Sequence, residues 1–438
     1  MIRHTKIDGY PQSRRSPARV LMAVLLFLPS VGLPAGGNSE NAGENAGAVA
    51  NEQAGAETAS EDSRDAGMVE ADFSGGPEGP DYRDPRLPEA FANQEPPRRA
   101  AGQFTTDFSR ATISFADVIS GGPPKDGIPA IDNPRFVSVE EADSWIADRE
   151  SVLVVSQGGE THIHPIQILM WHEIVNDVVG GVPVSVTYCP LCNTGAAFLR
   201  NFDGQTLDFG VSGMLRFSNM IMYDRQTETW WQQASGEGVA GKYAGGRLEI
   251  LPLLMVPWED ARSAYPNADV VSRDTGYARS YGRNPYAGYD RASQPFLYRG
   301  PAINGEYDPM TRVVTVNLKG ESEGFPYPVL RNRRVVEETL GGDEIVVMWA
   351  PGTASPLDAS SVSGGRDIGT ANAFRARLDG EPLSFEVEGE EIVDTRTGSV
   401  WNGSGRAVSG ELEGRQLEPL PQVQHFWFSW TAFEPGDG

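Results

Sequence analysis

Leu248-Glu-Ile-Leu-Pro252 is repeated 169 residues later as Leu417-Glu-Pro-Leu-Pro421, since 417 minus 248 and 421 minus 252 both equal 169. The same separation holds for two further pairs, Trp258 with Trp427 and Pro266 with Pro435. A constant separation over a stretch of this length is typical of an internal repeat. The pattern predicts two related halves, residues 101–300 and 301–438.

The similarity between the halves extends upstream, to the apolar runs that precede Pro190 and Pro351. The alignment pairs each cysteine with a residue that has no thiol: Cys189 with Ala350, and Cys192 with Thr353. The chain has only these 2 cysteines. We therefore expect the first half to carry a Cys-Pro-Leu-Cys site and the second half to be degenerate at that position.

The local patterns predict a β-dominated α+β fold in which each half is an antiparallel sheet with one principal helix. The dipeptides Gly158-Gly159 and Asp203-Gly204 separate strand-like runs and predict hairpins. Pro165 suits the first position of a helix. Apolar residues then recur at near-helical spacing, which predicts a helix through Ile166, Leu169, Met170, Ile174 and Val178.

The first 36 residues have the pattern of a signal peptide. Arg14 and Arg15 precede an apolar run over residues 20–33, and small residues follow it. Sec export and twin-arginine export both remain open. Residues 37–100 are poor in large apolar residues, which predicts a disordered acidic linker. No later run is apolar enough to span a bilayer, so the sequence predicts a soluble mature protein in the periplasm or outside the cell.

The composition indicates a globular protein and argues against one class of partner. Of the 438 residues, 39% are hydrophobic, which is enough for two or three compact units. The formal net charge is -24, and nucleic acid requires a basic face. We therefore expect no nucleic-acid partner. The sequence leaves open whether an unknown small ligand or a protein is bound.

Scarce side chains with reactive or metal-binding groups are concentrated in the first half. Three of the 5 histidines, His162, His164 and His172, fall close together in the sequence and shortly before Cys189. His162 and His164 alternate on a predicted strand, so their side chains share one face. A strand, a helix and the end of the next strand could bring these groups together.

Three chemistries suit such a group, and a fourth reading leaves both thiols inert. The first is a metal site with Cys189, Cys192, His172 and His164 as ligands, a set that suits zinc or copper. The second is thiol redox, with Cys189 and Cys192 as the catalytic residues. The third is a structural disulfide in a non-enzymatic binding or scaffold module.

Three further residues are candidates for supporting positions around this site. Glu173 could orient a histidine as a hydrogen-bond acceptor. Arg216 and Asp224 could bind an anion or pair with each other, although Asp224 also suits a β-turn in which it bonds only the backbone.

The chain resembles the domain-of-unknown-function family 3179 of bacteria and archaea. Four motifs carry the resemblance: Ser120-Gly-Gly-Pro-Pro-Lys-Asp-Gly-Ile-Pro129, Trp171-His-Glu-Ile-Val-Asn-Asp177, Thr187-Tyr-Cys-Pro-Leu-Cys192 and Met222-Tyr-Asp-Arg-Gln-Thr227. The resemblance implies no established activity. It favours His172 over His162 as a site residue, because the His-Glu motif is a mark of the family. It weakens the case for His164, because family members commonly have Tyr at that position.

Overall fold

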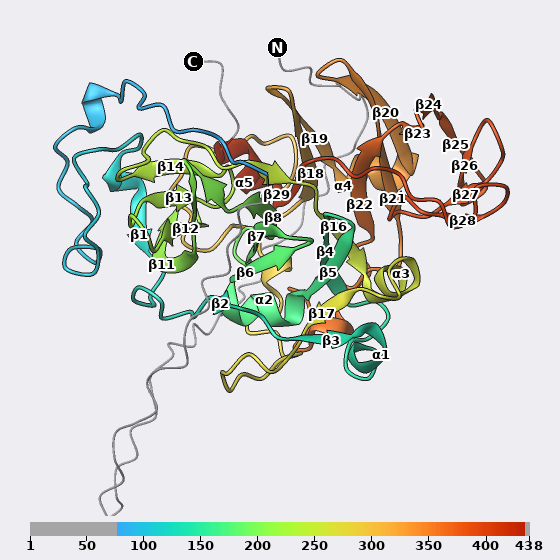
Figure 1. Ribbon diagram of the computed structural model, residues 1–438, viewed down its shortest axis with the longest axis horizontal. Coiled ribbons are helices and arrows are strands. Elements are labelled where there is room, and N and C mark those ends of the chain that lie inside the picture. Colours follow the sequence, from blue (N-terminus) through green and yellow to red (C-terminus); the bar gives the residue numbers. More distant parts are fainter. Residues whose placement is uncertain (1–76, 434–438) are drawn as a thin grey trace, which may run out of the picture. The chain divides into compact units, whose positions relative to one another are not determined.

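The computed structural model of the chain describes residues 77–433 (Figure 1). The predicted signal peptide and most of the predicted linker lie outside these residues. The last part of that linker, residues 77–100, contacts the first half. The ring of Tyr82 lies 5.3 Å from that of Tyr243 in an edge-on contact, and its hydroxyl donates to the Ala244 carbonyl at 2.9 Å.

The fold is β-dominated, with several sheets and few helices, as predicted. The N-terminal elements are η1 (Glu89–Phe91), η2 (Phe115–Asp117), β1 (Val118–Ser120), β2 (Ile131–Asp132), β3 (Phe136–Ser138) and α1 (Val139–Ala142). The next block runs β4 (Ser151–Gln157), β5 (Glu160–Pro165), α2 (Ile166–His172), β6 (Ile174–Val179), β7 (Val182–Cys189), β8 (Thr194–Leu199), β9 (Asn201–Phe202), β10 (Gln205–Thr206), β11 (Phe209–Arg216), β12 (Asn219–Asp224), β13 (Trp230–Gln232), β14 (Glu237–Ala240), β15 (Ile250–Leu251), β16 (Leu254–Pro257) and α3 (Trp258–Ala264).

A connecting segment leads to a second block of elements. It contains β17 (Asp269–Val271) and η3 (Tyr289–Arg291). The second block runs β18 (Arg312–Leu318), β19 (Glu321–Pro326), α4 (Tyr327–Arg333), β20 (Val335–Leu340), β21 (Asp343–Ala350), η4 (Val362–Gly364), β22 (Thr370–Arg375), β23 (Arg377–Leu378), β24 (Glu381–Pro382), β25 (Phe385–Glu388), β26 (Glu391–Asp394), β27 (Val400–Trp401), β28 (Ala407–Ser409), β29 (Gln422–Phe426) and α5 (Trp427–Phe433). Each block thus starts with a hairpin and a short helix and ends with a strand and a short helix.

The largest sheet takes strands from both blocks. Its order is β19-β18-β29-β8-β7-β6-β2, with β15 also paired to β8. The other main sheets have the orders β16-β4-β5-β17-β3, β1-β11-β12-β13-β14, β25-β26-β27-β28 and β20-β21-β22. Figure 1 shows β29 beside both β18 and β8, so the last strand of the chain joins the two blocks.

A second junction between the blocks involves β16 and β22. The Met255 N–H donates to the Asn372 side-chain carbonyl at 3.1 Å. The hydrophobic cores are shared in the same way. One core contains both cysteines together with Phe426 and Phe428 from the end of the chain. Because burial of large apolar side chains is the main source of stability, the cysteine region depends on the C-terminal elements.

The predicted hairpins are confirmed, but the predicted helix is shorter than expected. Helix α2 ends at His172, because Glu173 adopts the left-handed conformation with φ 59°. Ile174 and Val178 belong to β6 instead, which pairs along its whole length with β7. Strand β6 is buried on both faces, and such a strand has no alternating pattern to distinguish it from a buried helix.

Among residues 77–433, no helix combines the length and the apolar character that crossing a bilayer requires.

Candidate functional site

The Cys-Pro-Leu-Cys motif forms the tight connection between β7 and β8. Cys189 is the last residue of β7, and Cys192 lies in the turn that follows. Their exposed fractions are 1% and 0%. Both cysteines are free thiols, so the predicted structural disulfide is wrong. Cys192 Sγ lies instead within hydrogen-bond distance of an amide donor and 3.7 Å from the Cys189 carbonyl oxygen.

The amide donor is Asn219, the first residue of β12, whose Nδ2 lies 2.9 Å from Cys192 Sγ. Two residues in the left-handed region, Phe217 and Ser218, make the turn that delivers it. Hairpin turns of two left-handed residues usually contain Asn or Gly, so a Phe-Ser turn stores backbone strain. Strain of this kind is concentrated at functional sites, and here it fixes the residue that contacts the sulfur.

The orientation of the Asn219 amide is set by its neighbours. Its oxygen accepts from Gln232 Nε2 at 2.5 Å and from the Ala234 N–H at 3.0 Å. Its nitrogen also donates to Gln233 Oε1 at 2.8 Å, and the Gln233 amide is itself fixed through Nε2 by Thr187 Oγ1 at 2.9 Å. With both ends of the amide assigned, the second Asn219 N–H points at the sulfur.

The two thiols differ in acidity. Burial raises the pKa of Cys192, but hydrogen bonds from Cys189, Thr194 and Asn219 outweigh burial, and the net pKa lies below its ordinary value. Burial raises the pKa of Cys189 well above its ordinary value, and its hydrogen bond to Cys192 raises it further. Cys192 is therefore the more acidic of the two thiols.

Glu173 is a buried carboxyl group whose charge interacts with that of Cys192. It is buried, with 8% of its surface exposed, and occupies the left-handed position that ends α2. Its N–H donates to the Leu169 carbonyl at 2.6 Å, and its carbonyl accepts from the Tyr188 N–H at 2.8 Å. Burial, followed by the charge of Cys192, raises its pKa to about 8. The carboxyl group is therefore largely protonated near pH 7.

A covering segment over residues 281–298 closes the site. The Tyr289 hydroxyl donates to the Leu191 carbonyl at 2.7 Å, inside the cysteine motif. The pKa of Tyr286 is raised by burial and then by the charges of Glu173 and Cys189. The Phe426 N–H donates to the Cys192 carbonyl at 2.8 Å.

His425 Nδ1, in the second half, lies 3.1 Å from Thr194 Oγ1 in the first half. Its pKa is lowered to about 3 by burial.

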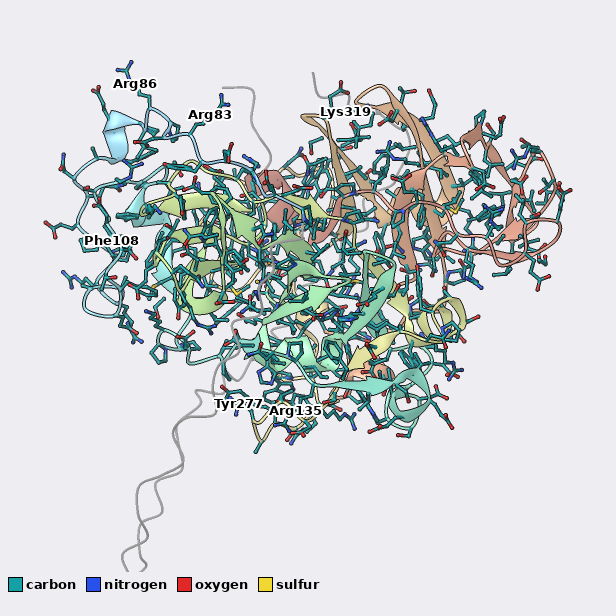
Figure 2. The ribbon with its side chains drawn as sticks, in the orientation of Figure 1. Arg83, Arg86, Phe108, Arg135, Tyr277 and Lys319 are labelled. Carbon is teal, nitrogen blue, oxygen red and sulfur yellow. The ribbon has the colours of Figure 1, made fainter. Side chains whose placement is uncertain are left out.

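His172 does not join the thiols. Its Nδ1 lies 2.8 Å from the Pro129 carbonyl oxygen, and its Nε2 lies 2.7 Å from the Tyr281 hydroxyl. Its ring centroid is 5.5 Å from that of Tyr277, which Figure 2 shows at the lower edge of the view, among the outermost side chains. Burial lowers the pKa of His172 to about 4, so the ring is neutral near pH 7.

His162 and His164 share a face, as predicted, but that face holds a carboxylate. Asp177 Oδ2 lies 2.8 Å from His162 Nδ1 and 2.9 Å from His164 Nε2. Burial raises the pKa of Asp177, but the two histidines outweigh it and hold the pKa well below its ordinary value. Within residues 77–433, no three His, Cys, Asp or Glu side chains are arranged to hold a metal ion. The predicted zinc or copper site is therefore not assembled from its predicted ligands, because the histidines have other partners.

Arg216 and Asp224 do not form an ion pair with each other; each has other partners. The Arg216 guanidinium stacks 4.3 Å from the Phe217 ring centroid, and burial lowers its pKa. Asp224 accepts from the Thr227 N–H at 2.6 Å and from Trp231 Nε1 at 2.9 Å. Asp224 therefore occupies a turn, which the sequence analysis gave as the alternative to anion binding.

The sequence did not identify several residues of the site: Asn219, Gln233, Tyr286, Tyr289 and Thr194. The consecutive amides Gln232-Gln233 after two tryptophans were an available signal, because buried amides require fixed partners. The tyrosines of the covering segment carried no signal, because the segment has no regular pattern and Tyr289 is 98 residues away from its partner, Leu191.

The chain belongs to the family described as "Protein of unknown function (DUF3179)", which matches residues 125–437. The match spans both blocks of the fold and includes every residue of the thiol site. Neither a curated protein nor a solved structure matches the chain.

Proposed function

We propose that this family member is an exported dithiol redox protein, in which Cys192 reacts with a small hydroperoxide and Cys189 resolves the product. The observation that carries the proposal is the Asn219 side chain, whose fixed N–H lies 2.9 Å from Cys192 Sγ. A hydrogen bond to a buried sulfur stabilises the thiolate, which is the reactive form of cysteine.

The small size of the oxidant follows from burial. The two cysteines expose 1% and 0% of their surface beneath Tyr289 and its segment. A disulfide on a protein surface cannot reach such a sulfur without a large movement of the covering segment. A hydroperoxide of a few atoms requires only a small opening.

The chemistry balances with the groups present. The Cys192 thiolate attacks one peroxide oxygen and becomes a sulfenic acid, while the O–O bond breaks and Glu173 gives its proton to the leaving oxygen. Cys189 then attacks the Cys192 sulfur, forms the disulfide and releases water, with the Glu173 carboxylate relaying its proton. One dithiol and one hydroperoxide thus become one disulfide, water and an alcohol or a second water. A small-molecule dithiol, which is subject to the same limit on access as the oxidant, reduces the disulfide by exchange.

Two further parts of the proposal rest mainly on the sequence. Export is supported by the signal-like pattern of residues 1–36. Relatedness of the two halves is supported by a shared motif in which an aspartate caps a turn and accepts from a tryptophan seven residues later. The motif comprises Asp224, Thr227 and Trp231 in the first half, and Asp394, Thr397 and Trp401 in the second.

The test treats the reduced protein with one equivalent of hydrogen peroxide at pH 7. We expect both thiols to disappear and a Cys189–Cys192 cross-link to form, detected by mass spectrometry. Cys189→Ser should stop at a sulfenic acid on Cys192 that dimedone traps. Cys192→Ser should give neither product. Thiols that stay unmodified in the folded wild type, or that react no faster than in the unfolded chain, would contradict the proposal.

A matched pair of asparagine variants separates thiol chemistry from stability. Asn219→Asp keeps the acceptor for Gln232 but replaces the donor to Cys192 with a negative oxygen. The pKa of Cys192 should rise, and each unit of rise lowers the thiolate fraction at pH 7 about tenfold. Asn372→Asp makes the same change at a fully buried asparagine of the second half, which donates to the Met255 carbonyl at 3.2 Å. It should lower stability without changing the peroxide rate of the folded protein.

A further inference from the structure

A cavity of about 420 Å³ lies in the second half, between the start of β18, helix α4 and the end of β21. Its lining includes three arginines, Arg312, Arg331 and Arg366, in a chain whose formal net charge is -24. The lining contains one carboxylate, Asp367, which is already bound to the backbone N–H groups of Gly352 and Gly369 at 2.8–3.0 Å. Two of the arginines are already ion-paired: Arg312 lies 3.0 Å from Asp290, and Arg366 lies 2.8 Å from Asp290 and 3.0 Å from Asp358. Arg331 is the lining arginine that forms no ion pair within residues 77–433.

Two buried donors on the wall of this cavity have no partner. Arg312 is 7% exposed and Trp349 is 5% exposed. Arg312 Nε and Trp349 Nε1 make no hydrogen bond within residues 77–433. A buried donor without an acceptor costs about 1–3 kcal/mol, so two on one wall indicate a site that is completed by an acceptor from outside.

The lining also contains Arg331, the Tyr327 hydroxyl, and Thr311 and Asn332, which can donate or accept. Arg331 is exposed on α4 and forms no ion pair with any residue of the described chain. The Tyr327 hydroxyl is already used, since it donates to Gln424 Oε1 at 3.0 Å. Met310, Pro328 and Ile368 supply apolar surface beside these donors. A ligand that fits has an anionic, acceptor-only group and an apolar body.

We propose that this cavity binds a small organic acid, with its carboxylate facing Arg312, Trp349 and Arg331. Guanidinium groups match the planar, two-oxygen geometry of a carboxylate. The volume is within the range of small-molecule sites, and the apolar residues leave space for a hydrocarbon portion larger than inorganic phosphate. This proposed binding site does not depend on the thiol chemistry, and the two proposals can be tested separately.

The probe is sodium benzoate, titrated into the purified protein and followed by calorimetry or by ligand-observed NMR. Benzyl alcohol, which keeps the ring but has no charge, is the matched neutral probe. We expect benzoate to bind and benzyl alcohol to bind at least tenfold more weakly. Absence of benzoate binding, or stronger binding of inorganic phosphate than of benzoate, would overturn the organic-acid assignment.

The variants use the two arginines of α4. Arg331→Glu should weaken benzoate binding at least tenfold, because it places a negative group on the cavity wall. Arg333→Glu makes the same charge change at an exposed position of the same helix but outside the lining, and should change affinity less than twofold. Equal weakening by both variants would mean a general charge effect and would overturn the site.

Trp349→Phe retains an aromatic ring but removes the Nε1 donor. It should weaken benzoate binding several-fold while the circular dichroism spectrum stays unchanged. If the variant binds benzoate with unchanged affinity, Trp349 Nε1 does not donate to the ligand and the proposed site is contradicted at this residue.

Discussion

The ends of β7 and β21 occupy corresponding places in the two blocks, and they differ in chemistry. Both follow a seven-residue helix that ends in a left-handed residue, Glu173 with φ 59° in one and Arg334 with φ 65° in the other. Both left-handed residues make the same backbone bonds, to the helix at 2.6 Å and from the strand at 2.8 Å. The same backbone geometry thus places the Glu173 carboxyl near the thiols in the first block. In the second block it places the Arg334 guanidinium over the Trp349 ring.

The difference indicates which features the fold requires and which it does not. The backbone conformation after the helix is common to both blocks, so we attribute it to the fold. The thiols and Glu173 occur in the first block only, and the covering tyrosines belong to the connecting segment. We therefore do not attribute these groups to the fold. The following predictions compare matched positions in this way.

The largest expected effect is a loss of stability in both blocks. Asp224→Ala and Asp394→Ala each leave a buried Trp Nε1 and a Thr hydroxyl without their acceptor. Each should lower the free energy of unfolding by about 3 kcal/mol, measured by urea denaturation. A loss in one block alone would show that the two aspartates do not have equivalent roles.

Acid titration should then distinguish the same two aspartates. For Asp394, burial raises the pKa, but hydrogen bonds from Trp401 and Thr397 outweigh it, and the net pKa is lowered. The stabilisation that charged Asp394 gives to the folded chain is therefore present above the unfolded pKa of about 3.9 and is lost as the pH falls. The pKa of Asp224 is raised by burial, so its charged form is disfavoured and its contribution falls as the pH rises.

The next effect concerns the left-handed residues themselves. The pKa of Glu173 in the folded chain, about 8, lies above its ordinary value of 4.5. Between these pH values the folded chain keeps a proton that the unfolded chain has lost, so stability falls as the pH rises. Glu173→Gln should be near neutral at pH 5 and should stabilise the protein at pH 9 by on the order of 2 kcal/mol.

The matched control is Arg334→Gln, which occupies the same backbone position but has no buried carboxyl. Its effect on stability should be the same at pH 5 and pH 9. If both variants showed the same pH dependence, Glu173 would not be the group that titrates. Thermal unfolding at the two pH values is sufficient for the comparison.

The sequence predicted the β-rich fold class and the hairpins at Gly158-Gly159 and Asp203-Gly204. Glycine and aspartate carry turn information locally, so these elements can be recognised without a fold. The partners of the thiols could not be recognised in this way. Asn219 reaches Cys192 through a Phe-Ser turn that has no typical turn sequence, and His172 has a partner, Tyr281, more than a hundred residues away.

The smallest effect concerns two buried tyrosine hydroxyls, one in each region. Tyr289→Phe removes the bond to the Leu191 carbonyl, and Tyr327→Phe removes the bond to Gln424. Each should cost about 1 kcal/mol of stability, the usual value of one hydrogen bond. Only Tyr289→Phe should also raise the rate at which hydrogen peroxide modifies the thiols, by a few fold, because only Tyr289 ties the covering segment to the cysteine motif. Equal stability losses with an unchanged thiol rate would mean that the covering segment does not limit access to Cys192. The reactivity of the site would then be set by the Asn219 hydrogen bond and Glu173 alone.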